Sequence, residues 1–198
     1  MNKTIACLIF ASSLVAVEAT AADLTRARKI VEEKCHLCHG TDGEASSVIY
    51  PRLAGQHKEY IVKQLNNFRS GERQGTMNAL AADVTDDEIN ALAEYFNQKP
   101  TLKHRIHDEE FAAVGKYIFH QGNRFSGVAA CASCHGEGGA GTQTMPRLAG
   151  QHKRYGSAQL DDFNSRKRTN DNAIMHSIAS KLTELEIESV ALYVSGLE

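Results

Sequence analysis

Two short segments, Cys35-His36-Leu37-Cys38-His39 and Cys131-Ala132-Ser133-Cys134-His135, decide how this chain is organised. Each places two cysteines three residues apart and follows the second at once with histidine. Cys-X-X-Cys-His is the pattern by which c-type haem is attached. Two thiols at this spacing on one helical turn can each form a thioether with a haem vinyl group, and the adjacent histidine can give the iron its proximal nitrogen. The chain is therefore predicted to bind two covalent haem c groups.

Other uses of four cysteines fit the pattern less well. Four-cysteine zinc sites usually space their two pairs about 15–20 residues apart, whereas these pairs begin 96 residues apart. A thioredoxin-like pair needs a strand-helix-strand setting, and no run here alternates with period two. Disulfides remain chemically open to an exported protein.

The N-terminus has the organisation of an export signal. Lys3 precedes the apolar run 5–17, and Ala19-Thr20-Ala21 supplies the small residues that a signal peptidase needs. The run of 13 residues is shorter than the roughly 20 that span a membrane. We predict a signal peptide over 1–22, cleaved after Ala21 or Ala22, and a mature chain outside the cytoplasm; a retained amphipathic anchor is the alternative.

The mature chain is an internal duplication. The segment 51–60 recurs as 146–155 with nine of ten positions identical, and the offset between the copies is 96 at the cysteines, 95 here and 98 near the end of each copy. We therefore predict two domains, residues 23–103 and 104–198, each within the normal size range of a domain. The polar segment 98–108, which contains Pro100, is interpreted as the linker.

The apolar spacing predicts helices in both copies. Apolar residues at helical spacing mark 111–119 and, more weakly, 24–31 before the cysteine motifs. Matching stripes follow in 60–68 and 155–163, and again in 89–96 and 187–194. The last pair of helices begins with capping boxes, Thr85 with Glu88 and Thr183 with Glu186. The expected fold is all-α, with little or no sheet.

Two methionines are the candidates for the second axial iron ligand. Met77 lies 38 residues after His39, and Met175 lies 40 after His135, so they occupy equivalent positions in the duplication. A methionine opposite histidine favours electron transfer and a raised reduction potential, whereas an open iron favours oxygen or peroxide chemistry. We predict two low-spin haems of positive potential. Met145 has no methionine counterpart and is interpreted as packing or loop surface.

Some histidines compete for the same role. His57 and His152 are matched, although they lie at predicted helix starts, and His176 has Asn78 as its counterpart. Three unmatched histidines are interpreted as solvated surface: His104, His107 and His120.

Three further groups of residues each allow two interpretations. The carbonyl of Pro51 or Pro146 is a candidate acceptor for the free N–H of the proximal histidine, or the proline is simply a helix-entry residue. Arg52 and Arg147 either pair with haem propionates or lie in solvent. The basic run 166–168 is interpreted as solvated surface or as a steering site for an acidic partner.

The doubled motif, the matched methionines and the repeated Pro-Arg-Leu-Ala-Gly-Gln segment together resemble the cytochrome c4 family over essentially the whole mature chain. The resemblance implies two tandem class I cytochrome c domains, related by a pseudo-twofold axis, whose haems face each other through their propionate edges. It also implies a periplasmic electron carrier between quinol–cytochrome c reductase and a terminal oxidase; some members associate with the membrane.

Composition and the iron ligands limit the alternatives. The formal net charge of −2 argues against a nucleic-acid binder, which needs a basic face. The chain is not expected to be an enzyme: a dihaem peroxidase needs one open or releasable iron position, and the matched Met77 and Met175 argue against that alternative. The alternative that remains is an electron-accepting dihaem subunit of a flavin dehydrogenase.

Overall fold

The computed structural model describes residues 19–198, and almost all of the predicted signal peptide, residues 1–22, lies outside this range. The N-terminal unit contains α1 (Ala19–Ile30), the π-helical turn η1 (Val31–Cys35), α2 (His36–His39), α3 (Lys58–Ser70), α4 (Met77–Ala81) and α5 (Asp86–Asn97). The C-terminal unit contains α6 (Glu109–Gln121), α7 (Ala132–His135), α8 (Lys153–Asn164), α9 (Ile174–Ala179) and α10 (Glu184–Ser195). The all-α prediction is confirmed; within 19–198 the only β contact is one isolated bridge between Asn123 and Val128.

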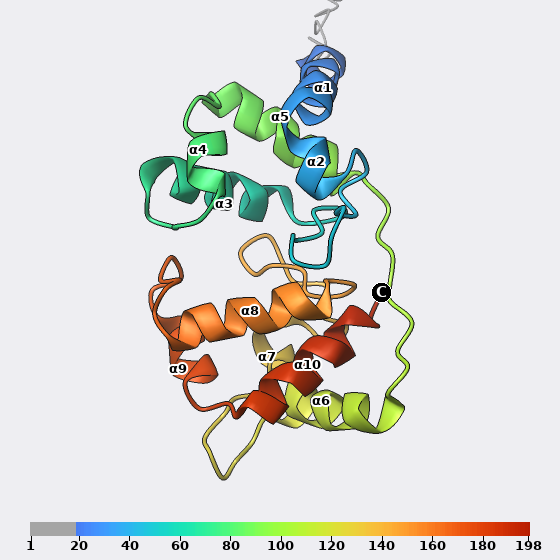
Figure 1. The fold of residues 1–198 in the computed structure, drawn as a ribbon, viewed down its shortest axis with the longest axis vertical. Helices are drawn as coiled ribbons and strands as arrows, with labels where there is room; N and C mark the ends of the chain where they lie inside the picture. Colours follow the sequence, from blue (N-terminus) through green and yellow to red (C-terminus); the bar gives the residue numbers. More distant parts are fainter. Residues whose placement is uncertain (1–18) are drawn as a thin grey trace, which may run out of the picture.

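Each unit has its own hydrophobic core. In the first, Val31, Ile89 and Phe96 are almost fully buried where α1, α3 and α5 meet. In the second, Phe119 and Ile187 are buried where α6 and α8 pack on α10. The two units lie end to end, and the chain between them runs down one side of the molecule (Figure 1). No helix within the described part of the chain is both long and apolar enough to cross a bilayer.

Local sequence signals place the long helices correctly. Thr85 accepts a hydrogen bond from the backbone N–H of Glu88, whose side chain accepts from the backbone N–H of Thr85. Thr183 and Glu186 repeat the arrangement at the start of α10. Both predicted capping boxes are therefore present. The short helices α4 and α9, which carry Met77 and Met175, were not predicted, because five or six residues are too few to show a helical period.

The contact between α6 and α10 depends on a glycine. A Cβ atom at Gly115 would lie 2.0 Å from the backbone carbonyl oxygen of Ser189 in α10. Real Cβ atoms do not approach so closely, so the two helices can pack at this distance only because position 115 has no side chain.

Gly115→Ala is therefore expected to destabilise the C-terminal unit by about 1–3 kcal/mol, the usual cost of overpacking a core. Denaturant unfolding of the haem-loaded protein measures the loss. Gly138→Ala is the matched control, because nothing lies within 4 Å of a Cβ at Gly138. Equal stability of the two variants would contradict the packing argument.

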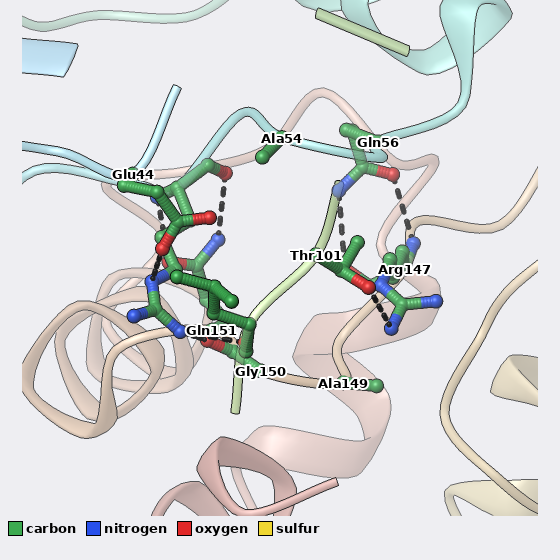
Figure 2. A pocket seen from close by; sticks show the side chains of 10 residues that line it. Glu44, Ala54, Gln56, Thr101, Arg147, Ala149, Gly150 and Gln151 are labelled. Atoms are coloured by element: carbon green, nitrogen blue, oxygen red, sulfur yellow. Dashed lines mark hydrogen bonds and ion pairs between the residues drawn. The ribbon is translucent and has the colours of Figure 1, made fainter. Parts of the chain in front are cut away.

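Two glutamines bind the units to each other reciprocally. Gln56 donates from Nε2 to the Arg147 carbonyl at 3.0 Å, and its Oε1 accepts from the Arg147 N–H at 2.8 Å. Gln151 makes the same pair of bonds with Arg52, at 3.1 and 2.8 Å. Figure 2 shows the two contacts, that of Gln151 at the left and that of Gln56 at the right, and each joins one unit to the other. The repeated segment therefore carries the interdomain contact twice, once in each direction.

Two histidines add a second reciprocal contact. His57 Nε2 lies 2.8 Å from the Ala140 carbonyl, and His152 Nε2 lies 3.2 Å from the Glu44 carbonyl. Both histidines immediately precede a helix, α3 and α8, as predicted. Because a carbonyl only accepts, each ring donates through Nε2. These two histidines therefore use Nε2 to hold the interface.

The linker also contributes to the interface, where His104 is half-buried. Its backbone N–H donates to the Ser195 carbonyl at 2.9 Å, and its ring stands 4.8 Å from that of His152, centroid to centroid. The expectation of a solvated His104 is therefore wrong. Burial, together with the charges of Arg52 and His152, lowers the pKa of His104 to about 4.

Acid is expected to weaken this interface. His104 titrates near 6.5 when unfolded and near 4 when folded, so the unfolded chain binds more protons between these values and stability falls as the pH drops through that window. The free energy of unfolding, measured with denaturant at about pH 7 and about pH 4.5, should fall less between these two pH values in His104→Gln than in the parent. In His107→Gln, which changes an exposed position, the free energy of unfolding should fall as much as in the parent. Equal losses in all three proteins would contradict the assignment.

Candidate haem sites

None of the four cysteines of the two motifs forms a disulfide in the structure. Cys35 ends η1 and Cys38 lies in α2, whereas Cys131 immediately precedes α7, which contains Cys134. Burial raises the pKa of both Cys35 and Cys131 to about 11. Each motif therefore presents two unpaired sulfurs on a short helical turn, as the sequence predicted.

The motif histidines have the environment of a buried metal ligand. His39 and His135 are each 7% exposed. The Nδ1 atom of His39 lies 3.1 Å from the Pro51 carbonyl, and that of His135 lies 3.1 Å from the Pro146 carbonyl. Because the carbonyl only accepts, Nδ1 carries the proton and Nε2 keeps its lone pair. The hydrogen bond from each motif histidine to a proline carbonyl, one of the two roles expected for Pro51 and Pro146, is present in the structure.

Burial also keeps these imidazoles neutral. Desolvation lowers the pKa of both His39 and His135, and the hydrogen bond to the proline carbonyl offsets part of that effect. Their Nε2 atoms make no hydrogen bond with any residue in 19–198. A neutral imidazole with a fixed tautomer and a free Nε2 is the form that binds iron. The residues present therefore fit a haem ligand.

The two matched methionines lie at corresponding places. Met77 is the first residue of α4, Met175 is the second of α9, and both are half-buried. The neighbouring side chain anchors each short helix to the end of the preceding long one. Asn78 Nδ2 donates to the Phe68 carbonyl at 2.6 Å, and His176 Nδ1 lies 3.0 Å from the Phe163 carbonyl. His176 thus makes the contact that Asn78 makes in the other unit.

The described residues offer no site at which side chains alone would bind a metal ion. Across residues 19–198 no three His, Cys, Asp or Glu side chains gather as a metal site. The two cysteine pairs lie in separate units. The four cysteines therefore do not gather into one four-cysteine site within the described residues.

Arg52 and Arg147, the predicted propionate partners, have protein partners at the interface between the two units. Arg52 forms an ion pair with Glu44, Nε to Oε2 at 2.9 Å, and donates to the Leu102 and Gly150 carbonyls at 2.8 and 2.6 Å. Arg147 Nη2 lies 3.4 Å from the Thr101 hydroxyl (Figure 2). Neither is simply solvated surface, and Arg52 already has a carboxylate partner within the protein.

Sequence reasoning missed a second pair of arginines. Arg168, expected in a solvated basic run, is 7% exposed, and Arg73, its counterpart in the duplication, is 9% exposed. Arg166 and Lys167 are exposed as expected. Each buried guanidinium stands 4.5 Å over the phenylalanine that ends the preceding helix stripe, Phe68 or Phe163. The spacing of 95 residues between the two arginines, the same as in the repeated segment, was the signal that could have identified them.

These arginines meet at the centre of the interface, in what we call the interface arginine cluster: Tyr60, Gln64, Arg73, Tyr155, Gln159 and Arg168. Gln64 Oε1 accepts from Arg73 Nη1 at 2.6 Å and from Arg168 Nη2 at 3.2 Å. Gln159 Oε1 accepts from Arg73 Nη2 at 2.7 Å and from Arg168 Nη1 at 2.8 Å. Two guanidiniums sharing two acceptors repel each other; unit charges about 6 Å apart do so by about 3 kcal/mol at an effective dielectric constant of about 20.

Two duplicated helical units, each joining a Cys-X-X-Cys-His turn to a carbonyl-anchored histidine, define a dihaem c-type cytochrome. Residues 22–96 match the family model for cytochrome c oxidase, cbb3-type, subunit III, and residues 115–198 match that for cytochrome c. Cytochrome c4 from Thiocapsa roseopersicina is 39% identical over 82% of this chain and 86% of its own length. Cytochrome c4 from Pseudomonas aeruginosa is 34% identical over the whole of both chains. The chain belongs to the cytochrome c4 family.

A solved structure supports the same conclusion. Reduced recombinant cytochrome c4 from Pseudomonas stutzeri superposes with a TM-score of 0.81 at 31% identity, covering 88% of this chain and 98% of that one. The protein accordingly carries two covalently bound haem c groups and transfers electrons between redox protein partners. The predicted family, fold class and cofactors are confirmed.

Proposed function

We propose that Cys35 and Cys38 attach one haem through thioethers, with His39 as its proximal ligand. Cys131, Cys134 and His135 do the same for the second haem, within domains that span 23–103 and 104–198. The observation that carries this proposal is the matched pair of motif histidines. In each, the Nδ1–H group donates a hydrogen bond to a proline carbonyl at 3.1 Å, and Nε2 has no hydrogen-bond partner among the described residues.

Met77 and Met175 are proposed as the second axial ligands. Their equivalent positions on α4 and α9 support this assignment. His57 and His152 are poorer candidates, because each uses Nε2 for the opposite unit. When bound, each iron takes up and releases one electron. With His39 and Met77 on one iron and His135 and Met175 on the other, no iron position would be open to a substrate, so we propose a carrier rather than a catalyst.

We further propose that the carrier works in the periplasm, after removal of residues 1–22, between quinol–cytochrome c reductase and a terminal oxidase. Peripheral contact with the membrane is compatible with this place. The interfaces with redox partners are expected to bury little surface and to be short-lived, as is usual for electron-transfer complexes.

The second candidate function is that of an electron acceptor for a dehydrogenase. The thiosulfate dehydrogenase electron acceptor of Thiomonas intermedia is 32% identical over 82% of this chain and 77% of its own length. The cytochrome subunit of sulfide dehydrogenase from Chlorobaculum tepidum is 38% identical over 48% of this chain. Co-purification with a dehydrogenase, and reduction by it faster than by the reductase, would favour this second candidate.

A redox titration followed by optical spectroscopy tests the site assignment. It should reveal two low-spin haems per chain, two positive potentials and the ferric methionine–iron charge-transfer band for each. Mass spectrometry of the exported chain should add two haem masses. Peroxide turnover with a reduced donor, or a titration without the sulfur band, would refute the proposed ligands.

A further inference from the structure

The interface arginine cluster is a buried concentration of positive charge whose two guanidiniums have no carboxylate within ion-pair distance among the described residues. Among residues 19–198, neither Arg73 nor Arg168 forms an ion pair with a carboxylate. Asp171 acts on Arg168 only at longer range. Their hydrogen-bond partners are neutral amides and phenols. Burying charge without a compensating partner is costly, so two such guanidiniums together call for an anion.

The cluster is also shared between the units. Arg73, from the N-terminal unit, reaches Tyr155 at 3.1 Å and Gln159 in the C-terminal unit. Arg168 reaches Tyr60 at 2.7 Å and Gln64 in the other direction. Burial raises the pKa of Tyr155, but the two guanidiniums outweigh that effect and lower it overall. Each guanidinium therefore acts on residues of the opposite unit.

Each arginine lies close in sequence to one proposed iron ligand. Arg73 lies four residues before Met77, and Arg168 lies seven before Met175. Each haem c carries two propionate carboxylates, which are the anionic groups this protein brings with it. Bidentate guanidinium–carboxylate pairing is the favoured geometry for such a contact.

We propose that Arg73 and Arg168 form one common counterion for the propionates of both haems, so that either arginine sets both reduction potentials. This inference rests on the proposed haem sites. A positive charge near a haem disfavours Fe(III), so loss of either guanidinium lowers both potentials. The arginines are positioning residues that act on the irons through the electric field; they do not bind iron.

Arg73→Gln and Arg168→Gln test the proposal by redox titration of the dihaem protein. At a fixed solution potential, each should lower the ratio of reduced to oxidised haem by about tenfold at both sites, the effect of one unit charge roughly 10 Å away at a dielectric constant of about 20. Arg154→Gln is the matched control, because it removes the same charge from an exposed position on α8 and should leave both potentials nearly unchanged.

Gln64→Glu provides a second test in case the arginine variants do not accumulate. It conserves size, offers the guanidiniums a protein carboxylate and should also lower both potentials. Covalent haem mass is measured first for every variant. Chains with two haems whose potentials do not move, or of which only one moves, overturn the shared counterion alone. Absence of haem from the unsubstituted chain overturns the haem sites instead.

Discussion

Serine in place of both Cys35 and Cys38 is expected to remove one haem and to unfold the N-terminal unit. The core of that unit is small, built around Val31, Ile89 and Phe96. A single hydrophobic core in a unit of only about 80 residues supplies little stability on its own. The porphyrin supplies much of the missing contact, and the thioethers keep it in place, so the free energy of cofactor binding is also free energy of folding.

Mass spectrometry and helical circular dichroism measure this result together. The variant should carry one haem mass instead of two and should lose one cooperative unfolding transition. The double substitution at Cys131 and Cys134 should mirror it in the other unit. Leu37→Ser is the control, since Leu37 lies between the two thiols and is 70% exposed. A single-haem chain with native helicity and both transitions would contradict the expectation.

Met77→His is expected to lower the potential of one haem and leave the other nearly in place. Thioether sulfur favours Fe(II) more than imidazole does. A fall on the order of 0.1–0.3 V is expected, within the roughly 0.8 V over which axial ligands tune haem potentials. Met175→His should do the same at the other haem, and each variant should lose one ferric sulfur band.

Met145→His is the matched control for these changes. Met145 is half-buried in the loop before Pro146 and is not a proposed ligand, so both potentials and both sulfur bands should remain. A Met77 variant with two unchanged potentials would exclude Met77 as a ligand. The pattern also separates ligands from counterions: a ligand substitution shifts one haem, whereas Arg73→Gln shifts two.

The long helices were predictable because their signals are local. Each capping box, at Thr85 or Thr183, involves residues only three apart in the chain. Each apolar stripe likewise lies within a single helix and recurs with the duplication. The haem motifs were predictable because covalent attachment dictates the residue types and their spacing. Both kinds of evidence are independent of how the two units pack.

The interface was not predictable in the same way. Arg168 lies in a run of three basic residues that looks solvated, and its burial depends on Tyr60 and Gln64, more than 100 residues away. His104 was likewise judged by its polar linker, although its ring packs against His152. Arg52 could be given a plausible partner, but the actual one, Glu44, became evident only in the fold. Long-range polar contacts leave no periodic trace in a sequence.

The reciprocal glutamines have an evolutionary consequence. Because Gln56 binds the backbone of Arg147 as Gln151 binds that of Arg52, the contact is isologous, the type that two identical subunits form about a twofold axis. One copy of the Pro-Arg-Leu-Ala-Gly-Gln segment holds both the arginine backbone and the glutamine amide. One half of the chain is thus complementary to its own duplicate. Tandem fusion of a self-associating monohaem ancestor would therefore have preserved an existing homodimer interface and made its formation independent of protein concentration.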